Sequence, residues 1–475
     1  MGIWPITLGP EMRNSGLKMN KHLVVFLCRY ETNDVDASIP EVWAAETLRI
    51  LEEELVVYPL VNNDYNNQVA SYGDTVNISK PAQFTARRKA VTSDVTTQNA
   101  TLTNTQAVLN QQLHVSFLLR DRQMSLSFQD LVAMFLDRAV RSMAHQIDTS
   151  ILAQRYQFIS NGVGKLGTAL ARTSLIANNK KADDLLWPND DRVVVVTPGA
   201  AADILDNDNI SHADSLGDNS AVRRASLGQL WNMHYVKSTN NKTIAYTGGT
   251  TAGAINAGNL IVGSTSLTVD GFTGYLDPGT WCTIAGDMTP QKITDTTDTS
   301  GVTVGITIAP GLKSAVLDDA VVTVYDKGQV NLAAGYASGW EEDMVIDTFT
   351  AAPAVGQLIS SGTASTGPIY AQMNGGSATL LRTDRPTDAI LADDALLGIG
   401  PVGDFSFAFH RDVLTFVSRP LAKDPDANMA VLDHNGLALR VELSRDSVGQ
   451  GKRVTVDLLY GIKVLDTNLG FLLYS

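Results

Sequence analysis

Apolar residues between positions 127 and 160 recur with the spacing of an amphipathic helix. Steps of three and four place side chains on one helical face, and the stripe consists of Phe128, Leu131, Val132, Phe135, Ala139, Met143, Ile147 and Ile151. The opposite face is assigned the polar residues Asp137, Arg138, Arg141, Gln146 and Asp148. Ser127 and Asp130 form a capping signal, and no Pro or Gly follows before Gly162. The pattern predicts one helix to about Ser160, roughly 50 Å long, although an ordinary amphipathic helix packed on one sheet fits it as well.

Two further patterns precede this stretch. "IPEVWAAETLRILEEELVVYPL" (residues 39–60) opens near a Pro and carries Trp43, Leu48, Leu51 and Leu55 on one side, which predicts a short helix. "YGDTVNISKP" (72–81) and "AVLNQQLHVSFLL" (107–119) alternate apolar and polar residues and are joined by a long polar stretch. They predict a β-hairpin arm that leaves the body of the protein, and because an isolated hairpin is marginally stable in water, the arm is expected to lie against something.

The remainder of the chain is mainly strand and turn. "DRVVVVTPGAAADIL" (191–205) predicts a buried strand, a turn and a helix, and residues 217–238 turn back through Gly228 into another strand. From about Ser238, strands rich in Thr, Gly and Val alternate with turn signals such as Pro278-Gly279 and Pro310-Gly311, which predicts a small β-barrel or sandwich. Residues 340–397 form either a second barrel or an extension of the first. Residues 405–475 contain long alternating strands.

Charge and composition narrow the function classes. The 475 residues carry a formal net charge of −14, which argues against tight binding of nucleic acid through clustered Lys and Arg. Charged residues make up only 18% of the chain, and Gly, Ala, Thr and Ser are abundant, a pattern common in β-rich proteins whose surfaces are covered by neighbours. The length predicts two to four domains.

Compartment signals are few. Cys28 and Cys282 are the only cysteines, which gives no disulfide framework and fits a reducing compartment. The apolar run within "KHLVVFLCRY" (21–30) is too short for a signal peptide, and no stretch approaches the roughly 20 apolar residues of a membrane span. The first 18 residues are expected to be a loose arm or to precede the true start at Met19.

Catalytic patterns are weak throughout. "GIGPVG" (398–403) has the letters of a dinucleotide-binding fingerprint, but Pro401 lies inside it and an alternating strand follows, so a turn between domains is favoured. No zinc-ligand spacing is found among His114, His145, His212, His234, His410 and His434. Solvated turns explain the carboxylate pairs better than a glycosidase site does; the pairs are Glu52-Glu53, Asp183-Asp184, Asp318-Asp319 and Asp393-Asp394. The sequence therefore predicts no enzyme, and no catalytic, cofactor-binding or metal site.

"FTARRK" (84–89) is the densest basic cluster. It could pair with an acidic neighbour or with nucleic acid inside a particle, and a solvated arm surface explains it equally well.

The order of the elements resembles the major capsid proteins of tailed bacteriophages with the Hong Kong 97-like fold, in the podovirus-type form that carries a telokin-like insertion domain. Three stretches carry the resemblance: "RVVVVTPGAAADIL" with "AVRRASLGQL", "LTVDGFTGYLDPGTWCTIAGD", and the closing "GLALRVELSRDSVGQGKRVTVDLLYGIKVLD". The similarity covers residues 39–475. "WNMHY" (231–235) departs from the family's usual Gly-Phe turn, and residues 340–397 have no counterpart in the simplest members.

The resemblance implies an α+β Hong Kong 97-like fold with a defined division of the chain. Its parts are an N-terminal arm with a short helix (1–65), an E-loop hairpin (66–120), a peripheral domain with a spine helix (121–190), the first part of an axial domain (191–238), an inserted β-barrel (239–330), a second β-rich segment (331–400), and closing axial and peripheral strands (401–475).

The function implied is that of a structural protein that assembles with itself, as hexamers and pentamers, into an icosahedral shell around double-stranded DNA. Scaffolding protein and a portal are the implied partners, DNA is enclosed without sequence-specific contact, no membrane is involved, and the shell is built in the host bacterial cytoplasm to become the virion capsid. The expected intersubunit contacts are Phe84, Arg87, Arg88, Lys89, Arg138, Arg141, Asp295 and Asp298.

Two alternatives remain. A secreted β-rich surface-layer protein or adhesin would also be acidic and rich in Thr and Gly, but should carry a secretion signal and repeated modules. A polysaccharide-active enzyme would need an aromatic cleft beside paired carboxylates, and aromatic residues are only 7% of the chain.

Overall fold

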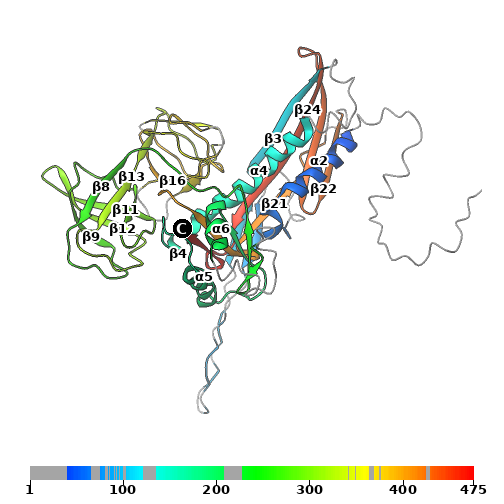
Figure 1. The fold of residues 1–475 in the computed structure, drawn as a ribbon. Helices are drawn as coiled ribbons and strands as arrows, with labels where there is room; N and C mark the ends of the chain where they lie inside the picture. Colours follow the sequence, from blue (N-terminus) through cyan, green and yellow to red (C-terminus); the bar gives the residue numbers. More distant parts are fainter. Residues whose placement is uncertain are drawn as a thin grey trace, which may run out of the picture.

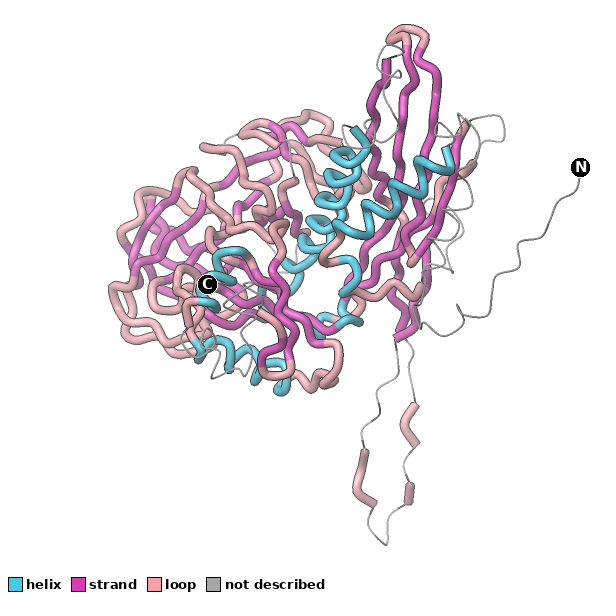
Figure 2. Tube along the Cα trace, turned by 45° about the vertical axis from the view of Figure 1, so that its right-hand side comes forward, coloured by secondary structure: helices cyan, strands magenta, loops and turns pink. Residues whose placement is uncertain are grey.

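The computed structural model shows a mixed α+β protein, as the sequence predicts (Figure 1). It describes residues 40–65, 75–80, 103–120, 135–207, 227–340, 342–347, 349–362, 368–373, 376–423 and 428–475, with short pieces between 84 and 99. A long antiparallel sheet with two helices lies at one end of the molecule, two β units lie at the other, and a six-stranded mixed sheet lies between them (Figures 1 and 2).

The long sheet has the order β21 (Leu414–Arg419), β24 (Gly451–Val464), β23 (Leu437–Asp446) and β22 (Met429–His434), and β3 (Gln111–Arg120) also pairs with β24. Helix α2 (Pro40–Glu54) packs on β22 and β23, and helix α4 (Asp137–Ala153) packs on α2 and β3. Leu51 of α2, Ile147 of α4 and Val456 of β24 belong to one apolar core. Burial of this shared face holds the two helices on the sheet.

The predicted long helix is only partly α-helical. Met143, Ile147 and Ile151 of the predicted stripe are buried on α4, while residues 127–134, with the capping signal, lie outside the described residues. The α-helix ends at Ala153 and continues as the 3-10 helix η6 (Gln154–Asn161), so the prediction of α-helix to Ser160 is wrong over this stretch. In η6 consecutive side chains are buried rather than every third or fourth one, and these contacts favour the tighter turn.

The face assigned to Asp148 is also wrong. Asp148 is buried on the side of α4 that packs inward, four residues after Ala144 and three before Ile151. A charged residue was placed on the solvent face by its type alone, whereas its position on the helix places it with the apolar stripe.

The predicted hairpin is formed, but with a different second strand. β1 (Thr75–Lys80) pairs with β2 (Thr103–Val108) in a two-stranded antiparallel ladder, and the described pieces between residues 84 and 99 lie beyond its end (Figure 2). Most of the alternating stretch 107–119 instead forms β3, which pairs with β24 over ten residues. The assignment of residues 107–119 to the hairpin is therefore wrong beyond Val108. At its root, Ile78, Ala107 and Leu109 pack on Val417 and Leu459 of the long sheet.

The central sheet has the order β4 (Gly162–Gly164), β25 (Gly470–Tyr474), β20 (Phe405–His410), β5 (Arg192–Val196), β7 (Met233–Lys237) and β6 (Gln229–Leu230). β5 is buried on both faces, since Val195 joins the core of the long sheet while Val194 packs in a second core with α5 (Arg172–Asp184) and α6 (Pro198–Leu205). This double burial explains the unbroken valine run. The hydroxyl of Thr197 accepts a hydrogen bond from Ala200 N (3.1 Å) and caps α6.

The chain between β7 and β20 forms two β units. The first is a closed barrel in the order β10 (Trp281–Ile284), β11 (Gln291–Thr299), β12 (Val302–Ala309), β9 (Ser266–Asp270), β8 (Thr250–Ile255) and β13 (Val321–Tyr325). The second is a six-stranded sheet in the order β17 (Ile369–Ala371), β16 (Leu358–Ser361), β19 (Leu396–Ile399), β14 (Lys327–Val330), β15 (Met344–Asp347) and β18 (Leu380–Leu381). Each unit has its own apolar core. Gly398 and Ile399 of "GIGPVG" lie in β19, and the rest of this run connects β19 to β20.

Candidate assembly surfaces

The basic cluster of the hairpin lies beyond the end of β1. Phe84 is 67% exposed, and Arg87, Arg88 and Lys89 are all exposed. Among the described residues, no carboxylate forms an ion pair with these three basic side chains. A phenylalanine and three cations are therefore presented together on a projecting element, where the ring can be buried and the charges neutralised only by contacts that the described body does not provide.

Arg138 and Arg141 lie near the beginning of α4. Arg138 is exposed. Arg141 forms an ion pair with Asp137 on its own helix (Nε to Oδ1, 3.1 Å) and another with Glu54 at the end of α2 (Nη2 to Oε1, 3.3 Å). Its guanidinium thus joins the two helices of one subunit across the surface of the helical layer.

Asp295 and Asp298 are exposed on β11 of the barrel, where the strand is irregular. Asp295 Oδ1 accepts a hydrogen bond from Thr296 N (2.9 Å), and Asp298 Oδ1 accepts one from the Thr303 hydroxyl on β12 (2.6 Å). The eight residues expected to make intersubunit contacts therefore form three separate groups, on the hairpin, on α4 and on β11, and do not make one site.

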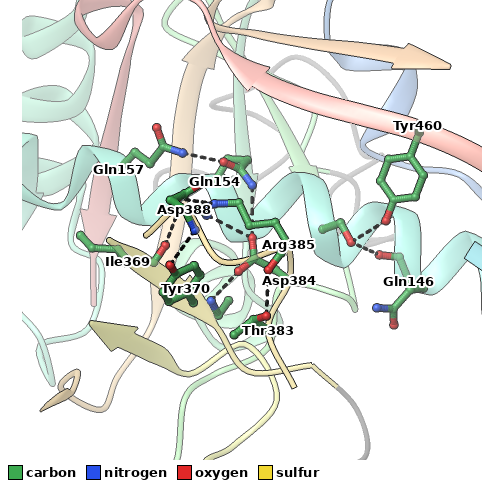
Figure 3. A network of polar contacts seen from close by, with 12 residues as sticks. Gln146, Gln154, Gln157, Ile369, Tyr370, Thr383, Asp384, Arg385, Asp388 and Tyr460 are labelled. Carbon is green, nitrogen blue, oxygen red and sulfur yellow. Dashed lines mark hydrogen bonds and ion pairs between the residues drawn. The ribbon is translucent and has the colours of Figure 1, made fainter. Parts of the chain in front are cut away.

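A buried polar network joins the helical layer to the second β unit (Figure 3). At its centre is Asp384, which follows β18. Gln154 Nε2, on η6, donates to Asp384 Oδ2 (3.2 Å), and Ala371 N, on β17, donates to Asp384 Oδ1 (2.7 Å). Gln157 Nε2 donates in turn to Gln154 Oε1 (2.6 Å), so the amide of Gln154 is held from both ends.

Arg385 supplies the positive charge of this network. Its guanidinium donates to Asp384 Oδ2 (3.3 Å), Asp388 Oδ2 (2.9 Å) and Ile369 O (2.7 Å), and lies 5.2 Å from the ring centre of Tyr370. Burial raises the pKa of Asp384, and the charge of Arg385 opposes that rise. Burial also raises the pKa of Tyr370 to about 12. The buried charges of this network are paired, and breaking it leaves a buried group without one of its partners.

A second buried carboxylate anchors the segment after α2. Asp148 accepts hydrogen bonds from the backbone N–H groups of Val56 (3.0 Å), Val57 (3.1 Å) and Tyr58 (3.3 Å). Asn240 Nδ2, in the loop after β7, donates to the same carboxylate (3.4 Å). Burial raises the pKa of Asp148, against the effect of these hydrogen bonds. One side chain of α4 therefore fixes the end of the α2 segment and a loop of the central sheet.

A cavity of about 730 Å³ lies where the hairpin root, η6, β24 and the two β units meet. Amide and apolar groups predominate in its wall, which includes Gln106, Gln111, Gln154, Trp281 and Ile369. In the described part of the chain no group of three His, Cys, Asp or Glu could hold a metal ion. No helix among those residues is long and apolar enough to cross a membrane.

Asp148 and Asp384, which join separate parts of the fold, were not identified from the sequence. For Asp148 a signal existed, since an acidic residue falls at helical spacing within an apolar stripe. For Asp384 the run "RTDRPTD" (382–388) carries no such periodic signal, and only the fold reveals that it packs against η6.

No family model and no characterised protein matches the sequence. Solved structures of similar shape exist. A chain of "Mycobacterium phage Che8" is 15% identical with a TM-score of 0.42, covering 88% of this chain and 90% of its own. A chain of the cyanophage P-SCSP1u capsid is 10% identical with a TM-score of 0.40, covering 85% of this chain and 84% of its own. A chain of the satellite phage P4 procapsid, determined with its size determination protein Sid, is 8% identical with a TM-score of 0.35, and 95% of each chain is covered.

Proposed function

We propose that the chain is a major capsid protein of tailed bacteriophages, a structural protein that assembles into the icosahedral shell enclosing the phage double-stranded DNA. The observation that carries this proposal is the projecting hairpin. β1 and β2 pair along six residues each, Ile78 and Ala107 pack on the long sheet, and beyond the ladder the chain presents exposed Phe84 with Arg87, Arg88 and Lys89. A two-stranded ribbon is marginally stable alone, so a second subunit is the natural surface on which it lies.

Charge supports contact between copies of the chain. The protein carries a net charge of −14, whereas the hairpin presents three adjacent cations. A basic arm on an acidic body is attracted to the body of another copy, which favours an arrangement in which each subunit both gives and receives an arm. Asp295 and Asp298 on β11 are proposed receiving residues, and Arg138 and Arg141 on α4 are proposed to meet a neighbour along the helical layer.

The interior of the chain fits a structural role. Asp148 and Asp384 join the helical layer to the central sheet and to the second β unit, so the body is tied together by polar contacts as well as by apolar packing. In the proposed shell no bond is made or broken by the protein. Its mechanism is repeated contact between rigid bodies through extended arms.

The finer assignments follow the sequence resemblance. The long sheet with α2 and α4 is proposed as the peripheral domain, the sheet around β5 as the axial domain, the hairpin as the E-loop, and the barrel β8–β13 as a telokin-like insertion of the podovirus type. Hexamers and pentamers, scaffolding protein, a portal and assembly in the host bacterial cytoplasm belong to the same proposal.

The test is electron microscopy of the purified chain, expressed alone and with candidate scaffold genes from the same source. The variant R87E/R88E/K89E removes the cations of the arm. Its matched control, R172E/K237E/K423E, reverses the same number of exposed basic residues elsewhere and changes the net charge equally. We expect closed particles from the wild type and the control, and unassembled subunits from the arm variant.

Wild-type subunits that remain monomeric with and without scaffold would contradict the capsid function. Flat lattices that never close would favour the surface-layer alternative. Closed particles from the arm variant, equal in yield to those of the control, would retain the function but exclude the basic arm as its contact.

A further inference from the structure

The two β units follow one strand circuit. In the first, the closed order β10-β11-β12-β9-β8-β13 returns to β10. The order of the second unit is β17-β16-β19-β14-β15-β18. If β14 to β19 are matched one by one, in chain order, with β8 to β13, this order is the same circuit opened between β17 and β18, which take the places of β11 and β12. The two edge strands of the second unit are joined by an isolated bridge between Gln372 and Thr383. This bridge occupies the place of the β11·β12 pairing, so the second unit is also a barrel, with a shorter final contact.

The pairing registers coincide residue by residue. Cys282 lies opposite Val324 in the first unit, and Ile359 lies opposite Ile399 in the second. Ala254 pairs with Val321 and with Asp270, and Gln329 pairs with Leu396 and with Asp347. Because a shift of one residue would move every side chain to the other face, a shared register means that the two cores are built from matching positions.

Loop contacts repeat as well. Asp318 Oδ1 accepts a hydrogen bond from Ala257 N (3.1 Å), and Asp393 Oδ1 accepts one from Leu332 N (3.1 Å). The next residues, Asp319 and Asp394, both have positive φ, 62° and 59°. Asp318-Asp319 and Asp393-Asp394, which the sequence predicts to be solvated turns, thus form the same hydrogen-bonded turn in the two units.

A close approach of glycine to an aromatic ring also recurs. A Cβ at Gly253 would overlap the ring of Phe272, and a Cβ at Gly328 would overlap the ring of Phe349. Gly253 pairs with Val322 and Gly328 pairs with Leu397, so the two glycines hold equivalent places. Such a detail is not required by a six-stranded barrel in general. Its presence in both units, with the common circuit, register and turns, indicates descent from one unit.

The copies differ at one end. In the first barrel the end loops are joined by the bridge between Leu260 and Val316, and in the second by the bridge between Tyr336 and Leu391. Beside the first bridge lie three exposed aliphatic side chains: Ile261 (74% exposed), Val262 (61%) and Leu317 (67%). The residues that follow the second bridge at the same steps are Ala337, Ser338 and Ala392, which are also exposed. In the second barrel the exposed Ile390 (76%) precedes the bridge residue Leu391 instead, and no large aliphatic residue follows the bridge at these three positions.

This difference shows which exposed side chains the barrel fold does not require. The second barrel makes the same loops with small residues at these positions, so Ile261, Val262 and Leu317 are not needed to form the barrel. Adjacent large aliphatic side chains exposed to water mark a surface that another molecule covers. We propose that residues 250–399 are a tandem duplication of one barrel and that only the first copy has acquired, at Ile261, Val262 and Leu317, a contact surface for a second copy of this chain.

The size of the surface identifies its occupant. Three side chains bury far less than the roughly 1,200 Å² of the smallest stable specific interfaces, so the surface cannot hold a separate partner by itself. A subunit already held by other contacts of a shell is present at high effective concentration, and a small apolar contact then adds to the assembly. The inference rests in this respect on the proposed capsid function.

The test uses the full chain without any other phage protein wherever the wild type assembles alone, and otherwise particles from which the scaffold has been removed. The variant I261S/V262S/L317S removes the surface, and A337S/A392S changes the equivalent positions of the second barrel. Thermal melting of unassembled subunits should be unchanged in both. Particle yield should fall at least about tenfold for the first variant, which corresponds to the loss of a modest apolar contact, and should be unchanged for the second.

Equal yield and equal urea resistance of particles from both variants and the wild type would overturn the contact surface. A loss seen only while scaffold is present would also overturn it, because the occupant would then be the scaffold. If I261S/V262S/L317S lowers the melting temperature, the single variant Val262→Asp serves with the same readouts. Absence of particles from the wild type would reject the capsid function itself, which is a different outcome from wild-type particles that ignore these substitutions.

Discussion

Gln154 on η6 and Asp384 after β18 are separated by 230 residues in the chain, and their side chains meet at 3.2 Å in the buried joint between the helical layer and the second barrel. The contact lies at the point where the α-helix has given way to the 3-10 helix. The 3-10 helix therefore begins at the residue that contacts the second barrel. At Gln154, the local change of helix type and the contact between the two parts of the fold occur together.

Replacing Asp384 should disrupt this joint. Asp384→Ala leaves Gln154 Nε2 and the Ala371 N–H without this acceptor, while Arg385 keeps only Asp388 and Ile369 O. Loss of one partner of a buried pair destabilises by about 3–5 kcal/mol. Asp384→Asn retains the shape and one acceptor, and should cost less. The measurement is the urea dependence of unfolding of unassembled subunits, followed by fluorescence. Asp343→Asn is the control, since its pair with Arg382 lies on the surface of the same barrel and contributes at most about 1 kcal/mol. Equal effects of D384A and D343N would contradict the role of Asp384.

The pH dependence of stability should reveal the burial of Asp148. Because burial raises the pKa of Asp148 in the folded chain, the folded state binds the proton more tightly than the unfolded state. Stability contributed by Asp148 is therefore greatest at acid pH and is lost as pH rises from the ordinary aspartate value, about 3.9, through the raised folded value. The stability of the wild type relative to Asp148→Asn should decrease as the pH rises above about 4, as measured by thermal melting.

Asp343 provides the comparison of opposite sign. The hydrogen bond from Arg382 holds the pKa of Asp343 below its usual range, so its small contribution is present above the unfolded pKa and lost as pH falls. The wild type relative to Asp343→Asn should show a weak trend in the reverse direction, because both side chains are partly exposed. A wild type that gains stability over D148N as pH rises would show that the hydrogen bonds to Asp148 outweigh its burial.

The sequence pattern predicts an element correctly where the tertiary burial of that element follows its own periodicity. The stripe of α4 and the valine run of β5 were correctly interpreted because burial of one helical face, or of both faces of a strand, leaves a periodic trace in the sequence. The assignment of β3 failed because its alternation says only that one face is buried. Its partner, β24, lies more than 300 residues further along the chain.

The candidate contacts show the same limit. A basic cluster is visible in the letters "FTARRK". The duplication of the barrel is not visible in the sequence, because the two barrels have few identical residues beyond the paired aspartates. Their equivalence lies in the pairing registers and the hydrogen bonds. The burial of Asp384 leaves no local trace either, because the surface that covers it comes from η6, which is distant in the sequence, and from β17.

Arg141 was expected to contact another subunit, and its ion pair with Glu54 makes a distinct prediction. The pair is exposed, so Arg141→Ala should lower the stability of the isolated subunit by no more than about 1 kcal/mol. A double-mutant cycle with Glu54→Ala measures the coupling directly. If Arg141 also meets a neighbour, particle stability should fall by more in R141A than in E54A. Equal particle stability of the two variants would restrict Arg141 to its role within one subunit.

The duplicated barrel predicts paired effects of paired substitutions. Gly253→Ala and Gly328→Ala each force a methyl group against a phenylalanine ring, and overpacking of this kind costs about 1–3 kcal/mol. The two variants should therefore be destabilised to a similar extent, as measured by urea unfolding, while Gly258→Ala, whose Cβ would meet nothing within 4 Å, should be nearly neutral. Replacing the phenylalanine by the smaller leucine removes the overlap with the added methyl group and should restore stability. Phe272→Leu should therefore offset Gly253→Ala, and Phe349→Leu should offset Gly328→Ala. A large effect at one glycine with none at the other would mean that the two approaches to a ring are not equivalent, which would count against a common origin of the two barrels.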